Sequence, residues 1–169
     1  MGRRGSSQPL AIWANGELVG SWTPATRRPM ELRYEDSWLA SRSARPLSLS
    51  LPLPLVGNEP IRGDRVEHFF DNLLPDRGAI RKRLAQRYAA GSEDTFNLLA
   101  AIGRDCVGAV QLLPLDEQPT GFNRIDGEVL GEEAVATLLR NTVRTGQFGH
   151  QGKEQDFRIS IAGAQEKTA

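Results

Sequence analysis

The sequence predicts an α+β domain, built on a mainly antiparallel sheet with a small cluster of helices. Three observations lead to this fold class. Two strand-like segments flank Asn15-Gly16, three stretches with helical spacing follow further on, and a strand returns near Val107. The 169 residues suit one ordinary domain with an appendage. Apolar residues make up 39% of the chain, and they are clustered enough to form a core.

The first predicted element is a β-hairpin. Residues 10–14 and 17–22 have the character of strands, and they are joined by Asn15-Gly16. This dipeptide is the one best suited to the two positive-φ positions of a type I′ turn. A third strand is predicted from Glu31 to Tyr34, after a loop that contains prolines.

The most regular pattern lies between residues 47 and 55, where every second residue is leucine and serine or proline stands between. This spacing places all five leucines on one face of an extended segment. Because Pro52 and Pro54 cannot donate hydrogen bonds to a neighbouring strand, the later half is predicted to be an edge or to leave the sheet. A binding groove is the alternative, but a buried sheet face is favoured.

Helical spacing begins near Asp64. The apolar residues that follow it have the i, i+3, i+4 spacing of one buried helix face: Val66, Phe69, Phe70, Leu73 and Leu74. Asp64 and Glu67 are predicted to cap this helix. Two further helices are predicted at 76–90 and 95–102, and the sheet strand after them ends the domain, which covers residues 10–114.

The helix at 76–90 is locally basic. Its cations are Arg77, Arg81, Lys82, Arg83 and Arg87. A solvated helix face is the favoured interpretation, and contact with nucleic acid is the alternative.

The character of the sequence changes after Pro114. Residues 115–156 are predicted to form a connector with one helix, at 131–143, and a mobile loop after it. Residues 157–169 are predicted to form a strand and a glycine-containing loop, and residues 1–9 a disordered N-terminus.

Composition excludes several classes of function. Lys+Arg and Asp+Glu number 21 each, so no overall charge draws the chain to nucleic acid or to a membrane. One cysteine excludes an internal disulfide and a cysteine-built metal site, and His68 and His150 lack the spacing of a metal pair. Neither a membrane-spanning run nor a signal peptide is visible, so we expect no membrane partner and a cytoplasmic location.

Only the carboxyl-terminal stretch suggests chemistry. A predicted strand at 157–161 runs into Ala162-Gly163-Ala164, whose small side chains allow backbone N–H groups to approach phosphate oxygens. A charge and a hydroxyl group could come from nearby side chains, namely Lys167 and either Ser160 or Thr168. Glutamate and not glycine precedes the lysine, so this is not a Walker A loop. From the residues alone, a strand ending in a small-residue turn is favoured.

Five blocks of the sequence, in the same order, resemble the HipA family of serine/threonine kinase toxins from type II toxin–antitoxin systems. The blocks are WANGELVG (13–20), WLASRSARPLSLSLPL (38–53), HFFDNLLPDR (68–77), IGRDCVGAVQLLP (102–114) and FRISIAGAQEKTA (157–169). The resemblance covers most of residues 10–114 together with 157–169, and the connector between them matches poorly. It implies the amino-terminal region of such a kinase, through its glycine-rich loop.

The resemblance also implies site residues. By residue matching, the loop that covers ATP consists of Ala162, Gly163, Ala164, Gln165, Glu166 and Lys167. The serine whose phosphorylation ejects this loop in the family matches Ser160. The family's catalytic aspartate and magnesium ligands lie in a larger helical region and match nothing in this chain, so no catalytic or metal residue is assigned. ATP and magnesium are expected in the complete kinase, with no tight binding of either to this chain alone.

Partners and function follow from the same resemblance. Complete members phosphorylate glutamyl-tRNA synthetase and cause growth arrest or persistence, and a small HipB-like helix-turn-helix antitoxin neutralises them and represses the operon. DNA is therefore expected as a partner only indirectly, through the antitoxin. This chain is expected to stop within the loop, to need a missing C-terminal kinase region and to be inactive alone. Two alternatives are a standalone, non-catalytic subunit that restrains a separate HipA-like kinase and, less favoured, a simple nucleotide-binding protein.

Overall fold

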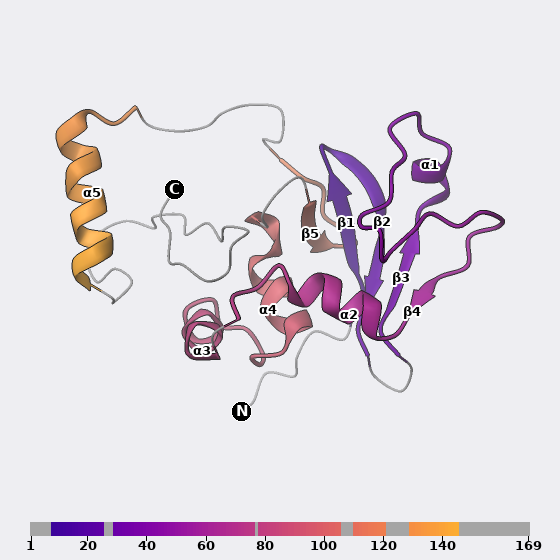
Figure 1. Cartoon of the computed structure of the whole chain (residues 1–169), viewed down its shortest axis with the longest axis horizontal. Helices are drawn as coiled ribbons and strands as arrows, with labels where there is room; N and C mark the ends of the chain where they lie inside the picture. The colour runs from indigo at the N-terminus through magenta and orange to yellow at the C-terminus, as the bar shows by residue number, and fades with distance from the viewer. Residues whose placement is uncertain (1–7, 26–28, 77, 106–109, 121–128, 146–169) are drawn as a thin grey trace.

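The computed structural model describes residues 8–25, 29–76, 78–105, 110–120 and 129–145. These residues form an α+β fold with a five-stranded sheet, in which neighbouring strands are antiparallel and the order is β4-β3-β2-β1-β5 (Figure 1). The strands are β1 (Leu10–Ala14), β2 (Glu17–Thr23), β3 (Glu31–Tyr34), β4 (Ile61–Arg62) and β5 (Val110–Pro114). The helices are α1 (Asp36–Leu39), α2 (Asp64–Asp71), α3 (Gly78–Arg87), α4 (Thr95–Ile102) and α5 (Glu132–Thr145), with the 3₁₀ turn η1 (Gly103–Asp105) after α4. The predicted fold class is confirmed.

The hairpin of β1 and β2 forms as predicted. Asn15 and Gly16 have φ angles of 51° and 80°, the positive values that a type I′ turn requires at both central positions. On its other side β1 pairs with β5, so that Leu10 lies opposite Trp22 in one neighbour and Pro114 in the other. The first and last strands of the domain are therefore adjacent.

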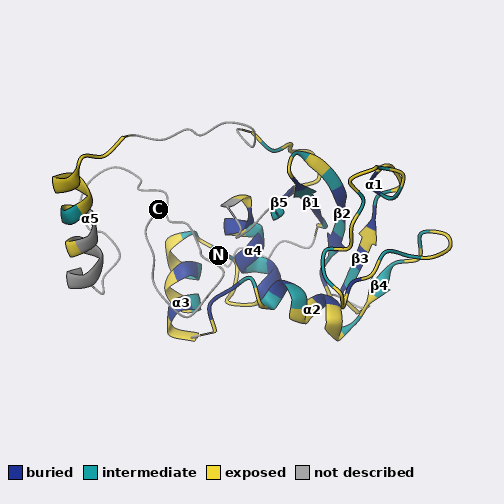
Figure 2. Ribbon diagram, turned by 45° about the horizontal axis from the view of Figure 1, so that its top comes forward, coloured by how far each residue is buried: buried dark blue, intermediate teal, exposed yellow. Residues whose placement is uncertain are grey.

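The core lies where α2 and α4 meet the sheet, and the buried surfaces of these elements face one another (Figure 2). Trp22 of β2 stacks on Phe70 of α2 with 3.8 Å between ring centroids, and Phe96 of α4 meets Trp22 edge-on at 4.7 Å. Offset and edge-to-face aromatic contacts add to the free energy gained from burial alone. These three rings join the sheet to both helices.

The predicted buried face of five leucines is wrong. Residues 47–55 form no strand of the sheet, and their only regular pairing is an isolated bridge between Ser48 and Leu51. Leu51 is fully buried, whereas Leu49 is 97% and Leu55 101% exposed. Prolines at 52 and 54 remove the hydrogen-bond donors that a strand would need, so the segment leaves the sheet. Leu51 anchors it in the core, and Leu47 and Leu53 pack against the core while partly buried.

A buried tyrosine fixes this segment in place. The Tyr34 hydroxyl donates to the Leu51 carbonyl oxygen at 2.6 Å and accepts from the Leu47 N–H at 3.0 Å. Burial raises the pKa of Tyr34, and the hydrogen bond from Leu47 lowers it by less. The loop is therefore held by polar contacts to β3 and not by a sheet ladder.

Helix boundaries differ from the prediction in instructive ways. The Asp64–Glu67 capping pair is wrong, because Gly63 stands at the N-cap of α2 with φ 86° and no side chain caps this end. Helix α4 is instead capped by Asp94, whose carboxylate accepts from the Asn97 N–H at 2.9 Å. Within the described residues, no helix has the length and apolar character needed to cross a membrane.

Candidate functional site

The residues predicted to bind ATP, Ala162 to Lys167, lie outside the described residues, and so does Ser160. Their roles in phosphate binding and in switching therefore stay predictions. The described residues before them offer two features that bear on function. These are a polar junction between helices and an exposed apolar loop.

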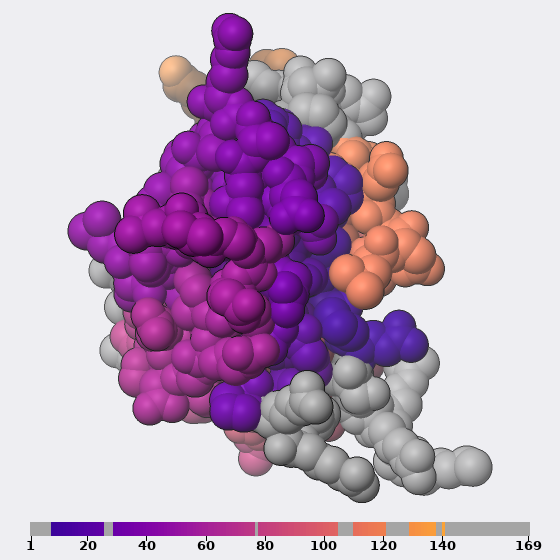
Figure 3. All heavy atoms as spheres, turned by 90° about the vertical axis from the view of Figure 1, so that its right-hand side faces the viewer, coloured from indigo at the N-terminus to yellow at the C-terminus, as the bar shows by residue number. Residues whose placement is uncertain are grey.

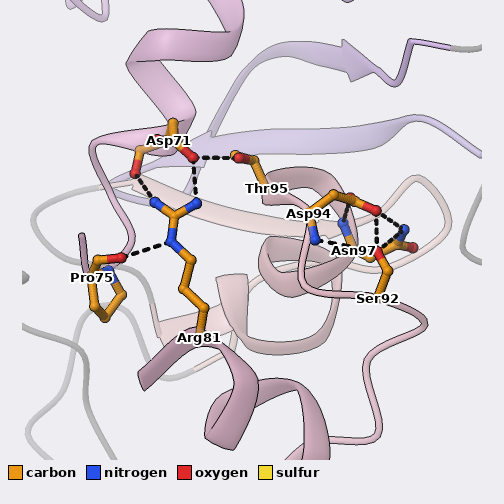
Figure 4. Close-up of polar contacts among 7 residues, drawn as sticks. All are labelled: Asp71, Pro75, Arg81, Ser92, Asp94, Thr95 and Asn97. Carbon is orange, nitrogen blue, oxygen red and sulfur yellow. Dashed lines mark hydrogen bonds and ion pairs between the residues drawn. The ribbon is translucent and has the colours of Figure 1, made fainter. Parts of the chain in front are cut away.

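The polar junction joins α2, α3 and the start of α4 (Figure 4). Arg81 of α3 donates from Nη1 to the Asp71 carboxylate at 2.7 Å and from Nε to the Pro75 carbonyl oxygen at 2.7 Å. The Thr95 hydroxyl donates to the same carboxylate oxygen of Asp71. The Arg81 side chain is only 17% exposed. The Asp71 carboxylate at the end of α2 is thus joined to α3 through Arg81 and to α4 through Thr95.

These contacts change the acidity of Asp71. The hydrogen bond from Arg81 is the largest cause and lowers the pKa of the Asp71 carboxyl, while burial works in the opposite direction. A second carboxylate, Asp94, is also affected. Burial acts to raise the pKa of Asp94, but hydrogen bonds from Ser92 and Asn97 outweigh it, and the pKa is lowered. Both side chains are therefore ionised acceptors near neutral pH.

The junction has the character of a structural clamp. Every polar group named in it has a partner inside the domain, and the described part of the chain holds no cluster of three metal-ligating side chains. An acceptor held ionised by an arginine is a poor general base, because it binds a proton weakly. The junction accordingly fixes helices and supplies no catalytic group.

The Asp71 carboxyl gives the domain an acid-sensitive contact. Since its pKa in the folded state lies below the ordinary value of 3.8, the contact stabilises the fold above that value and is lost as the pH falls through the folded pKa. We expect the free energy of unfolding to fall between pH 5 and about pH 3, and Asp71→Asn to remove part of that fall. Urea unfolding measured across this range tests it, with Asp116→Asn in an exposed position as the matched control. Identical pH dependence in wild type and Asp71→Asn would contradict the assignment.

The second feature is the apolar loop, which we define as residues 47–58. Leu49, Leu55 and Val56 are 97%, 101% and 88% exposed. At the far end of the loop Asn58 donates to the Tyr34 carbonyl oxygen at 2.7 Å and to the Asp36 carboxylate at 2.8 Å. The loop is thus tethered at both ends, while these three apolar side chains are exposed to solvent. Figure 3 views the side of the molecule where this purple part of the chain covers much of the surface.

Sequence patterns indicate the structural role of some of these polar residues and not of others. Asp94 stands three residues before Asn97 and directly before an apolar helix, which is a recognisable N-cap position. Tyr34 and Asn58 gave no such signal, because their partners lie 13 to 24 residues away along the chain. Contacts of that kind depend on the tertiary fold.

Comparison with known proteins identifies the fold. The sequence matches the family model of the HipA N-terminal domain over residues 10–113, which include strands β1 to β4, most of β5 and the helices α1 to α4. The chain belongs to the HipA N-terminal domain family. The predicted family is therefore confirmed.

Two curated relatives come from Sinorhizobium fredii (strain NBRC 101917 / NGR234). The chain is 32% identical over 162 residues to the protein named "Putative kinase Y4mE". This match covers 94% of this chain and 37% of that protein. It is 29% identical over 152 residues to "Putative kinase Y4dM", and this match covers 88% of this chain and 35% of that protein. The chain thus spans little more than a third of the length of these relatives.

A solved structure has the same fold. It comes from the complex of the Shewanella oneidensis MR-1 toxin–antitoxin system HipA, HipB and its operator DNA. The TM-score is 0.56 at 22% sequence identity, and the match covers 86% of this chain and 32% of that one. At this level of identity the similarity supports the fold.

Proposed function

We propose that this chain supplies the N-terminal region of a HipA-like serine/threonine kinase toxin. The observation that carries the proposal is the extent of the match to Y4mE, which takes in 94% of the chain and so continues well beyond the family domain at 10–113. A standalone regulatory subunit would need only the domain itself. Similarity that continues through the connector favours a chain that leads into a kinase.

In this proposal the domain and the loop have different tasks. The loop from Ala162 to Lys167 covers the phosphates of ATP, since small residues bring backbone N–H groups close and a lysine adds positive charge. This set of donors fits phosphate and supplies no aspartate or asparagine for magnesium. The catalytic carboxylate and the magnesium ligands belong to the larger helical region that the family resemblance implies.

The chain alone is therefore expected to transfer no phosphate. Purified residues 1–169 incubated with magnesium and γ-labelled ATP should leave protein substrates unlabelled, because phosphoryl transfer needs a placed carboxylate and metal ligands. Fusing the chain to the part of Y4mE that it does not span should restore transfer. A Lys167→Ala fusion, shown to unfold like its parent, is the matched control and should lose activity.

Two outcomes would contradict this proposal. Labelling by the chain alone, retained after stringent purification, would place catalytic groups within it. A folded fusion without activity, combined with inhibition of Y4mE by the separate chain, would establish the alternative of a restraining subunit.

Ser160 is proposed as the switch of the complete kinase. In the predicted strand it alternates with Ile159 and Ile161, so we expect its hydroxyl on the opposite face from these two side chains, next to the loop in sequence. A phosphate there adds roughly 1.5 to 2 negative charges near donors that otherwise receive ATP. Phosphorylation is expected to displace Ala162–Lys167 and to weaken ATP binding by the fusion. Equal ATP affinity of the phosphorylated and unmodified forms would refute this, and Ser160→Ala should prevent inactivation by ATP.

The partners proposed are a HipB-like helix-turn-helix antitoxin and, through it, operator DNA. Support comes from the structural neighbour, which was solved with HipB and its operator. Glutamyl-tRNA synthetase is the proposed substrate, carried over from the family. The test is co-purification of the fusion with the product of a neighbouring helix-turn-helix gene, followed by labelling of purified glutamyl-tRNA synthetase.

A further inference from the structure

The turn between β1 and β2 holds a chemically labile pair of residues. Asn15 is the only asparagine in the sequence that a glycine follows. Asparagine is one of the side chains that degrade without an enzyme, because the backbone nitrogen of the next residue can attack the carbon of its side-chain amide. Glycine has no Cβ to obstruct that attack. The pair Asn15-Gly16 is therefore the place in the sequence where this reaction meets the least steric resistance.

The structure leaves this pair open to the reaction. Asn15 is exposed at the tip of the hairpin, beyond the last strand pair, which joins Ala14 to Glu17 (Figure 1). Its φ of 51° lies in the left-handed region, which asparagine tolerates and most other side chains avoid. A two-residue turn of this kind can open locally while the strands behind it stay paired. The Gly16 nitrogen can then reach the Asn15 side chain without unfolding of the domain.

Two other asparagines are held in place by hydrogen bonds. The Asn58 side-chain nitrogen donates to the Tyr34 carbonyl oxygen at 2.7 Å and to the Asp36 carboxylate at 2.8 Å. The Asn97 side-chain nitrogen donates to the Asp94 carboxylate at 2.7 Å. Each of these asparagines is also followed by a residue with a long side chain. They serve as internal references for the reaction at the hairpin.

We propose that Asn15 is a site of spontaneous deamidation in the folded protein. The Gly16 nitrogen gives its proton to water or hydroxide and bonds to Cγ of Asn15. The bond from Cγ to Nδ2 breaks, and the nitrogen leaves as ammonia, so that a cyclic imide remains. Water then opens the ring, and the net change converts an amide and a water molecule into a carboxylate and an ammonium ion. This inference goes beyond the proposed kinase function and does not depend on it.

The two ways of opening the ring have opposite consequences for the hairpin. Opening at Cγ leaves aspartate, and Asp-Gly suits the same type I′ turn as Asn-Gly. Opening at the main-chain carbonyl carbon leaves isoaspartate, in which the backbone runs through Cβ and is longer by one atom. Because loop length fixes the turn type and the register of the strands, the longer turn breaks the pairing of Ala14 with Glu17. Isoaspartate therefore loosens β1 at the end where it also pairs with β5 through Val110.

The test is to store the native chain in mildly alkaline buffer and to follow its peptides by mass spectrometry. The mass gain that marks replacement of an amide by a carboxylate should accumulate at Asn15, while Asn58 and Asn97 keep their amides. Electron-transfer fragmentation distinguishes aspartate from isoaspartate, and both products are expected. A sample stored in urea should react faster at Asn15, because there the turn is already open. The separated isoaspartate form should unfold at a lower urea concentration than the parent, and Asn15→Asp close to the parent.

Asn15→Gly is the matched control, since Gly-Gly also suits a type I′ turn and has no amide to lose. On storage it should keep its urea midpoint, whereas the parent should develop an early-unfolding fraction equal to its isoaspartate content. An amide retained at Asn15 in the native chain while the urea sample loses it would overturn the proposal. Equal loss at Asn58 or Asn97, or an isoaspartate form as stable as the parent, would also overturn it. None of these results bears on phosphoryl transfer by the fusion.

Discussion

Replacing Phe70 by alanine is expected to lower the free energy of unfolding by about 3–5 kcal/mol, the usual cost of emptying a core aromatic site. Phe70 is fully buried and stacks on Trp22, which also meets Phe96. The cavity would open at the point where α2 and α4 meet the sheet. Neither helix can close it without losing the remaining contacts of Trp22. Chemical denaturation, with the slope checked for two-state behaviour, measures the loss.

Phe69 provides the matched control for this experiment. It is the same residue type in the same helix, but it is only partly buried and contacts Phe70 edge-on at 5.1 Å. Phe69→Ala should therefore cost clearly less than Phe70→Ala. A loss below about 1 kcal/mol for Phe70→Ala would mean that the aromatic cluster is not part of the folded core.

The second large effect is expected at Gly20. A Cβ atom added at this position of β2 would lie 2.2 Å from the carbonyl oxygen of Arg33 in β3. Backbone cannot rotate away as a side chain can, so Gly20→Ala must separate β2 from β3. Overpacking of a core usually costs 1–3 kcal/mol, and we expect about 3 kcal/mol or more here.

Gly78 is the control for the glycine substitution. A Cβ there meets nothing within 4 Å, and Gly78 is the first residue of α3. Gly78→Ala should be neutral or stabilising by up to about 1 kcal/mol. If Gly20→Ala unfolded at the same denaturant concentration as the parent, the close approach of β2 and β3 would be refuted.

Local signals in the sequence were enough for the hairpin and for α4. Asn15-Gly16 has few alternatives to a type I′ turn, and the apolar run at 95–102 ends at Gly103 as predicted. The leucine repeat failed for a physical reason. The alternation of leucines indicates which side chains share a face of an extended chain, but burial also requires a second surface that packs on that face. The two prolines prevent the strand pairing that would supply this surface.

Local sequence signals could not predict the short elements or the polar junction. Strand β4 has two residues and α1 has four, too few for any period to show. The Asp71–Arg81 pair joins residues that neither helix pattern links, because both are polar, and Arg81 was predicted on a solvated helix face. For the candidate site, residue chemistry alone suggested phosphate binding at Ala162-Gly163-Ala164. The family resemblance added the full ATP loop and the phosphorylated serine.

The pairing of β1 with β5 has a consequence for how the domain folds during synthesis. Strand β1 leaves the ribosome first among the strands of the described sheet, yet one of its two neighbours, β5, is the last of these strands to emerge. Such a contact between the ends of the domain raises its contact order, and closing it must wait for nearly the whole domain. Until β5 arrives, one edge of β1 offers unpaired N–H and C=O groups to other nascent chains. The emergence of Pro114 from the ribosome therefore marks the point at which this sheet edge becomes protected from aggregation.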